Sequence, residues 1–325
     1  MKRIDVANGD ADGLCALHQL RLAERAEATL VTGMKRDIAL LERVRAAPGD
    51  LVTVCDISLD ANRAALERLL AGGARVRYFD HHYAGAIPSH PALEAHIEQQ
   101  AGVCTSLLVD RYLDGRYRAW AVVAAFGDGL PETGLRLAAP LSLDRARLEA
   151  LRELGEAINY NAYGEAESDA LLPPPYLYRL IAPYADPFAC LAAEPRLKEL
   201  AERRRDDQRL AQQVPPQLDL AWASARVMPD AAWSRRVSGD FANRLSAAQP
   251  ARAHAVLTPR TAGGYVVSVR APRGHAASAA ALCREFPTGG GRQEAGGINH
   301  LPTEALSGFL ERFAAYFGPS VDRRP

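Results

Sequence analysis

Short apolar runs alternate with stretches of helical period over the first 82 residues. The runs are rich in Val, Leu, Thr and aromatic residues, as strands are, whereas the stretches between them repeat apolar residues three and four positions apart. This alternation predicts an α/β fold, in which helices cover both faces of a parallel sheet. We expect strands at 3–7, 28–33, 50–56 and 75–82, and helices at 13–26, 36–47 and 61–73.

The pattern changes after about residue 190. Residues 194–213 are highly charged, fit a helix and end before a Pro-Pro pair, so we expect a connector between domains. Beyond it, 237–248 is predicted to be a helix packed on a second sheet that includes a strand at 265–271. The sequence therefore predicts a larger domain at 1–190, a helical linker at 191–215 and a smaller α/β domain at 216–325.

Acidic residues and histidines follow several of the apolar runs. If the runs are neighbouring parallel strands, the polar side chains meet at one edge of the sheet, where such folds bind their ligands. Carboxylates and imidazoles without thiolates suit Mn²⁺ or Mg²⁺ better than structural zinc, and this many ligands favours two ions. The residues concerned are Asp10, Asp12, Asp56, Asp80, His81, His82 and Asp128.

Simpler interpretations exist for each part of this cluster. The sequence NGDADG at 8–13 is also compatible with a tight turn or a fragment of a calcium loop. A calcium loop requires further acidic residues, however, and the residues that follow here have a helical pattern. The histidine pair is equally compatible with packed or capping histidines, although the preceding Asp80 at the end of an apolar run favours a site.

Composition excludes several classes of protein. Apolar residues make up 48% of the chain, as in ordinary globular proteins. The five cysteines are widely spaced and include no C-x-x-C pair, so we expect neither a disulfide framework nor a zinc ribbon. The N-terminus lacks the pattern of a signal peptide, and no stretch resembles a membrane helix. We therefore expect a cytoplasmic protein that has no membrane association.

Charge is balanced overall, with 39 basic and 39 acidic residues, but it is unevenly distributed. Residues 216–325 contain 13 arginines and 8 acidic residues, a net charge of +5, which leaves −5 for residues 1–215. Scattered surface charges would explain this difference, and so would a cation bound by the first part and an anionic ligand bound by the second.

Four motifs in this order resemble those of the DHH phosphoesterase superfamily. They are GDADG at 9–13, CDIS at 55–58, DHH at 80–82 and FGDG at 126–129. The resemblance extends from about residue 4 to 317. It implies a catalytic first domain, a glycine-rich DHH-associated second domain that binds substrate, and an active site in the cleft between them.

The resemblance also implies a metal centre with two Mn²⁺ ions, or Mg²⁺. In it Asp56 bridges the ions, Asp10 binds one, and Asp12, Asp128 and one of the two histidines bind the other. Many members have a histidine where this chain has Asn8, and an amide oxygen binds Mn²⁺ more weakly than imidazole does. We nevertheless expect Asn8 to lie beside the metals.

The sequence GGGRQEAGG at 289–297 resembles the substrate motif of the same family. Its consecutive glycines predict a backbone nest for an anion, and Arg270 on the preceding strand can bind phosphate. A flexible glycine turn is the alternative. Relatives commonly have histidine after the glycines, and the guanidinium of Arg292 is expected to bind rather than to donate a proton. The predicted substrate-binding residues are Gly289, Gly290, Gly291, Arg270 and Arg292, with Asn243 as a lesser candidate.

These features predict an Mn-dependent hydrolase that cleaves a phosphoester of a short oligonucleotide or small nucleotide by a two-metal mechanism. The histidine that does not bind metal is expected to contact the phosphate or protonate the leaving group, with Asp80 beside it. The alternatives are a nucleotide-binding regulatory protein with little turnover and a single-strand DNA exonuclease. The sequence indicates no protein partner and leaves a homodimer open.

Overall fold

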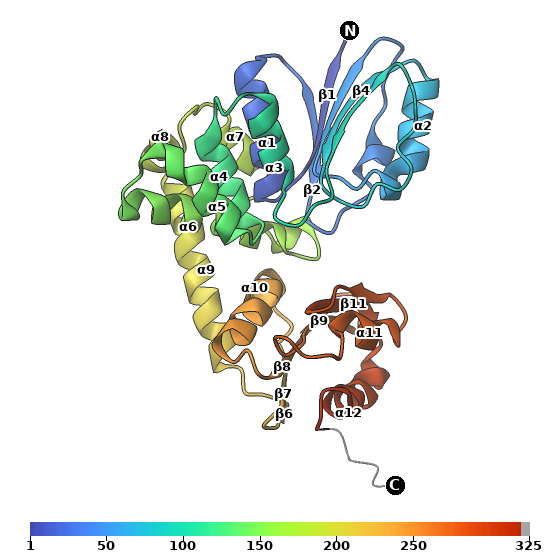
Figure 1. The fold of residues 1–325 in the computed structure, drawn as a ribbon, viewed down its shortest axis with the longest axis vertical. Coiled ribbons are helices and arrows are strands. Elements are labelled where there is room, and N and C mark those ends of the chain that lie inside the picture. The colour runs from blue at the N-terminus through green and yellow to red at the C-terminus, as the bar shows by residue number, and fades with distance from the viewer. Residues whose placement is uncertain (320–325) are drawn as a thin grey trace. The chain divides into compact units, whose positions relative to one another are not determined.

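The computed structural model describes residues 1–319, and the chain divides into two compact units, Met1–Arg203 and Arg204–Pro325 (Figure 1). The boundary between the units lies inside α9 (Pro195–Gln213), a helix in the region predicted as the connector. Among the described residues, no helix is both long and apolar enough to cross a lipid bilayer.

The first unit contains a five-stranded sheet in which every neighbouring pair is parallel, in the order β2-β1-β3-β4-β5. The four predicted strands are all present, which confirms the parallel α/β fold. The fifth strand lies at the edge and was not predicted. The strands are β1 (Arg3–Asn8), β2 (Thr29–Gly33), β3 (Leu51–Cys55), β4 (Arg75–Asp80) and β5 (Leu93–Ile97).

Helices cover both faces of this sheet (Figure 1). On one face, α2 (Arg63–Ala71) packs on alternate apolar strand residues such as Val6, Val54 and Val76. On the other face lie α1 (Ala11–Ala23) and α3 (Thr105–Tyr112), which contact β3 and β4. Further helices pack beyond them: α4 (Arg118–Gly127), α5 (Pro131–Ala138), α6 (Arg145–Ala162), α7 (Pro174–Ile181) and α8 (Pro187–Ala193).

The predicted helix at 36–47 was wrong. This segment contains only one short 3₁₀ turn, Leu40–Arg43. Leu40, Leu41 and Val44 are buried in the core beside α2, which explains the helical period. The Asn62 side chain, however, takes over part of the segment's backbone hydrogen bonding. The Asn62 amide donates to Ile38 O at 2.6 Å and accepts from Leu41 N at 3.2 Å. A side chain that directly precedes α2 therefore holds the segment in a loop.

The apolar run before Asp128 forms α4, a helix and not a strand. Almost every residue of α4 is buried, so it has no polar face and no helical period. A continuous apolar run of this kind cannot be assigned to strand or helix by periodicity. Asp128 therefore follows the C-terminus of a buried helix rather than the end of a sheet strand.

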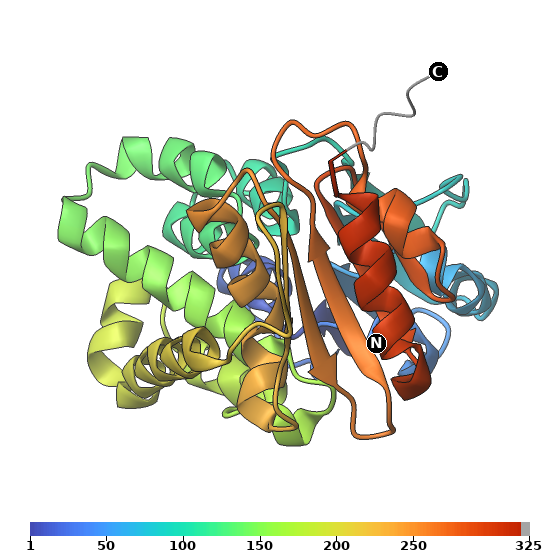
Figure 2. The ribbon, with the colours of Figure 1, turned by 90° about the horizontal axis from the view of Figure 1, so that it is seen from below.

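The second unit contains a mixed sheet in the order β10-β11-β9-β8-β7-β6. Helix α10 (Ala232–Ala248) packs on one face, and α11 (Ala279–Arg284) and α12 (Leu306–Tyr316) pack on the other with the apolar core (Figure 2). This confirms the smaller α/β domain and the predicted helix. The strands are β6 (Leu218–Asp219), β7 (Ala223–Val227), β8 (Ala253–Pro259), β9 (Tyr265–Arg270), β10 (Gly289–Gly291) and β11 (Ala295–Leu301).

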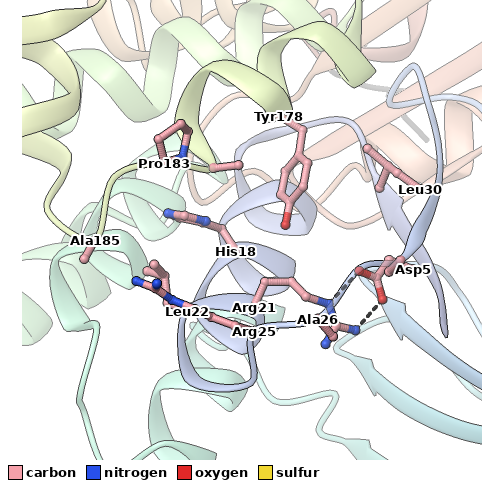
Figure 3. A pocket seen from close by; sticks show the side chains of 12 residues that line it. Asp5, His18, Arg21, Leu22, Arg25, Ala26, Leu30, Tyr178, Pro183 and Ala185 are labelled. Carbon is pink, nitrogen blue, oxygen red and sulfur yellow. Dashed lines mark hydrogen bonds and ion pairs between the residues drawn. The ribbon is translucent and has the colours of Figure 1, made fainter.

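A pocket of about 410 Å³ lies beside the C-terminal part of α1, and none of the predicted metal ligands lines it. Figure 3 shows His18, Tyr178 and the ion pair between Arg21 and Asp5 in its wall. The His18 ring is 1% exposed, and its Nε2 donates to Tyr184 O at 2.8 Å. His18 also packs edge-on against the buried Trp120, with ring centroids 4.7 Å apart. This histidine is therefore part of the packed interior.

Candidate metal centre

The carboxylates from the three central strands lie at the same edge of the first sheet. Because β1, β3 and β4 are adjacent and parallel, the residues after their C-terminal ends are neighbours. The chain order reverses between β1 and β3, the position at which ligands bind in sheets of this order. Asp10 follows β1 and Asp56 follows β3, so the two aspartates flank this position.

Glycine at position 13 is required by close packing. A Cβ atom there would lie 2.3 Å from the carbonyl oxygen of Asn8. The start of α1 can therefore approach the end of β1 only without a side chain at this residue. Asp10 is the N-cap of α1, and its Oδ1 accepts from Gly13 N at 3.0 Å. The motif GDADG thus makes a tight transition from strand to helix that places both aspartates at the sheet edge.

His81 is at the centre of the cluster. Its Nδ1 lies 2.8 Å from Val103 O, so Nδ1 carries the proton and Nε2 has a lone pair that could bind a metal ion. Three carboxylates face this Nε2, at 3.5 Å from Asp56, 3.9 Å from Asp12 and 3.9 Å from Asp128. The structure therefore brings together four predicted ligands that are spread over more than a hundred residues.

Asp12 is held by the N-terminus of α3. Its two carboxylate oxygens accept from Thr105 N and Ser106 N, both at 2.7 Å. These backbone donors fix the carboxylate and lie at the positive end of the helix dipole. Burial nevertheless raises the pKa of Asp12 to about 7, and the nearby charge of Asp56 adds to the shift. The Asp12 carboxylate is thus rigidly positioned, but burial and the charge of Asp56 destabilise its ionised form.

Asp56 has an unusual backbone conformation, with φ of 61°. Its backbone N–H donates to Phe79 O at 3.0 Å, and its Oδ1 accepts from the Thr105 hydroxyl at 3.1 Å. Left-handed backbone is uncommon outside glycine and often occurs at functional sites. Burial, followed by the charge of Asp10, raises the pKa of Asp56 to about 6.

The donor set fits a divalent ion. Burial raises the pKa of Asp12, Asp56 and Asp128, which means that their negative charges are poorly compensated by the protein alone. The ligand atoms of Asp12, His81 and Asp128 lie within 4.8 Å of one another, and so do those of Asp56, His81 and His82. A small cavity of about 90 Å³ opens onto most of these groups. Oxygen and imidazole donors of this kind suit Mn²⁺ or Mg²⁺.

His82 differs from His81 in its partners and exposure. Its Nδ1 lies 2.7 Å from Asp80 Oδ1, and its side chain is 44% exposed, against 16% for His81. Although burial lowers the pKa of His82, the hydrogen bond with Asp80 and the charge of Asp56 raise it to about 8. Asp80 itself is fully buried, and its Oδ2 has no hydrogen-bond partner within residues 1–319. Asp80 is thus placed to orient the His82 ring through the hydrogen bond with Nδ1.

Lys35 lies in the same cavity and was missed by the sequence analysis. Its Nζ donates to Asp10 Oδ2 at 2.5 Å and to Asn159 Oδ1 at 3.0 Å, and lies 3.6 Å from Asp128 Oδ1. Although burial would lower it, the charges of Asp10 and Asp128 raise the pKa of Lys35. Lys35 follows the end of β2, so the rule that identified the aspartates would also have identified this residue.

Asn8, which was expected to lie beside the metals, lines the same cavity and contacts Lys35. Its Nδ2 donates to Lys35 O at 3.4 Å, and its Oδ1 accepts from Asp10 N at 3.2 Å. Both ends of the amide are therefore used within the protein, and Asn8 connects β1 to the segment after β2.

In the second unit, the predicted substrate residues lie at one end of the sheet. Arg270 ends β9 and pairs in register with Ala295, which begins β11, and Arg292 lies in the turn just before Ala295. The Nε of Arg270 donates to Asn243 Oδ1 at 2.7 Å, so Asn243 positions the guanidinium. Arg292 is exposed, and its side chain forms no ion pair with any described residue.

The predicted glycine nest was wrong. Gly289–Gly291 form β10, an edge strand that pairs antiparallel with β11, and not a nest or a flexible turn. A Cβ at Gly289 would lie 1.7 Å from Cys283 O, and one at Gly291 would lie 2.4 Å from Ala295 O. A Cβ at Gly290 would meet no atom within 4 Å. Gly289 and Gly291 are therefore required for packing, whereas the backbone at Gly290 is uncrowded.

No protein-family model and no curated protein sequence matches the chain. Among solved structures, the chain is similar to exonuclease RecJ bound to manganese, with a TM-score of 0.65 and 22% identity over 100% of this chain and 91% of that one. RecJ from Thermus thermophilus in complex with Mn²⁺ has a TM-score of 0.64 and 22% identity, over 100% of this chain and 52% of that one. The pGpG-specific phosphodiesterase PggH from Vibrio cholerae has a TM-score of 0.53 and 14% identity, over 97% and 100%.

The chain therefore has the fold of the RecJ structures and of PggH. Within this fold, the four motifs recognised in the sequence supply the groups around the 90 Å³ cavity or directly behind it. The similarity covers the second unit as well as the first, since the alignment with RecJ spans the whole chain.

Proposed function

We propose that this chain is a divalent-metal-dependent phosphoesterase that acts on a nucleotide or a short oligonucleotide. The observation that supports this most directly is the convergence of Asp12, Asp56 and Asp128 on the Nε2 of His81. The RecJ structures contain Mn²⁺, and PggH is a phosphodiesterase for a dinucleotide. Mn²⁺ is the cofactor we propose, with Mg²⁺ as a substitute.

The proposed ligands are Asp12, Asp56, Asp128 and His81. A divalent ion bound there would lower the pKa of a bound water and neutralise charge on the phosphate. The protein contributes by fixing the ligand atoms beforehand. Backbone donors hold Asp12, the Thr105 hydroxyl holds Asp56, and Val103 O fixes the tautomer of His81. Little reorganisation is then needed when the ion binds.

His82 is the proposed proton donor to the leaving oxygen. Its Nδ1 proton is shared with Asp80, so Nε2 is the nitrogen left for substrate. The hydrogen bond with Asp80 and the charge of Asp56 raise the pKa of His82 to about 8 against the effect of burial, which favours the protonated ring. A positioned imidazolium can protonate an alkoxide as the ester bond breaks.

Arg270 and Arg292 are proposed to bind a phosphate of the substrate. Both lie at the same end of the second sheet, and Asn243 already orients Arg270. Two arginines form a compact anion site rather than an extended basic track, which favours a short substrate. A single-strand DNA exonuclease is the second candidate, because RecJ shares the fold.

A substrate screen with added Mn²⁺ tests this proposal. The substrates are a linear dinucleotide such as pGpG, a cyclic dinucleotide, phosphoadenosine phosphate and a single-stranded DNA of about twenty nucleotides. We expect hydrolysis that EDTA abolishes, with kcat/KM highest for a short substrate. A clear preference for the long DNA would favour the exonuclease. Absence of hydrolysis of all four would contradict the proposed function.

A further inference from the structure

We propose that the ammonium group of Lys35 takes the position of one metal ion, so that the chain binds one divalent ion tightly rather than two. This inference rests on the metal centre of the proposed function. The resemblance to DHH enzymes implied two ions, with Asp10 binding one of them. The contacts of Asp10 favour a different arrangement.

Both oxygens of Asp10 are already used by the protein. Oδ2 accepts from the Nζ of Lys35 at 2.5 Å, and Oδ1 accepts from Gly13 N at 3.0 Å. Asp10 belongs to neither group of ligand atoms that lie close enough to share an ion, and both of those groups contain His81. The carboxylate expected to bind the first ion is thus paired with a built-in cation.

Lys35 is held firmly in this position. Its backbone N–H donates to Ala162 O at 2.9 Å, which fixes it to the end of α6, and its carbonyl accepts from Asn8. Its Nζ is held by Asn159 as well as by Asp10, and its side chain is only 23% exposed. Because several partners already fix the ammonium, little further conformational entropy is lost by keeping it beside Asp10. Binding of an ion at this position would require these contacts to break.

The ammonium also affects the neighbouring ligand. Nζ lies 3.6 Å from Asp128 Oδ1, while Asp128 Oδ2 faces His81. A positive charge at this distance repels a divalent ion bound to Asp10, but it leaves the His81 side of Asp128 available. Asn8 fits the same arrangement, because its amide holds Lys35 and Asp10 in place instead of offering a metal ligand.

The test measures the number of bound Mn²⁺ ions in the full-length chain. Calorimetry and metal analysis are performed on the wild type, Lys35→Gln and Lys35→Arg, with Lys198→Gln as the control because Lys198 is exposed on α9. We expect one tightly bound ion in the wild type, in Lys35→Arg and in the control. Lys35→Gln should bind a second ion at least about tenfold more tightly than the wild type does. Electron paramagnetic resonance should then show coupling between two Mn²⁺ ions in Lys35→Gln alone.

Two tight ions in the wild type would overturn the role of Lys35 and leave the proposed metal-dependent function intact. A single ion in both the wild type and a folded Lys35→Gln would also overturn it. No Mn²⁺ binding by any of the proteins would contradict the metal centre itself. The wild-type stoichiometry and Lys35→Arg are informative even if Lys35→Gln does not fold.

Discussion

Buried His18 should make the stability of the first unit depend on pH. Burial lowers the pKa of His18 from 6.5 to about 4, because the ring is enclosed beside Trp120 and only its Nε2 has a polar partner. The unfolded chain therefore binds a proton that the folded chain excludes. This contribution to stability is complete above the unfolded pKa of 6.5 and is lost as the pH falls from there toward 4. Between pH 6.5 and pH 5, the loss is ~2 kcal/mol at ~1.36 kcal/mol per pH unit.

The assay is urea unfolding followed by circular dichroism near pH 7 and pH 5, with EDTA present to keep metal binding out of the comparison. His18→Gln keeps an N–H donor for Tyr184 O and removes the titrating ring. We expect its loss of stability between the two pH values to be smaller than that of the wild type by ~2 kcal/mol. The exposed His90, changed to Gln, is the matched control. Equal pH dependence in the wild type and His18→Gln would refute the reasoning.

Three further predictions concern the metal centre and the second unit. Asp56→Asn should lower turnover at limiting Mn²⁺ by at least about 100-fold and weaken Mn²⁺ binding; activity close to that of the wild type would exclude Asp56 as a ligand. Arg292→Ala should raise KM for a dinucleotide more than it lowers kcat, whereas Arg284→Ala, an exposed arginine on α11, should change neither; equal effects of the two would argue against a phosphate contact. Gly289→Ala should destabilise the second unit by ~1–3 kcal/mol because its Cβ would overlap Cys283 O, and Gly290→Ala should be nearly neutral; similar melting temperatures would contradict the packing of β10.

The sheet and its ligand-bearing edge could be predicted because each depends on local patterns. Short strands and intervening helices have different periods, and parallel order brings the residues after β1, β3 and β4 together. Asp10, Asp56 and His81 were therefore identified before their distances were known. The histidine pair could not be resolved in the same way, since the contacts of His81 with Val103 and of His82 with Asp80 depend on the folded structure.

The errors have physical causes that sequence patterns do not carry. Residues 36–47 have helical period because Leu40, Leu41 and Val44 face the core, but the Asn62 side chain fixes their backbone conformation. The glycines at 289–291 suggested a nest, although the crowding of Gly289 and Gly291 comes from residues that approach only in the folded sheet. Lys35 was missed because an ammonium group is not a metal ligand, although this residue follows a strand as the aspartates do.

The groups that surround His81 Nε2 come from widely separated parts of the chain, and this has a consequence for synthesis on the ribosome. Asp12 and Asp56 emerge early, but the helix that ends before Asp128 must also have emerged and packed before the cluster is complete. A nascent chain that stops before residue 128 therefore lacks one member of the cluster. If the cluster binds Mn²⁺ as proposed, tight binding of the ion would follow the packing of α4 and would report that this step is complete.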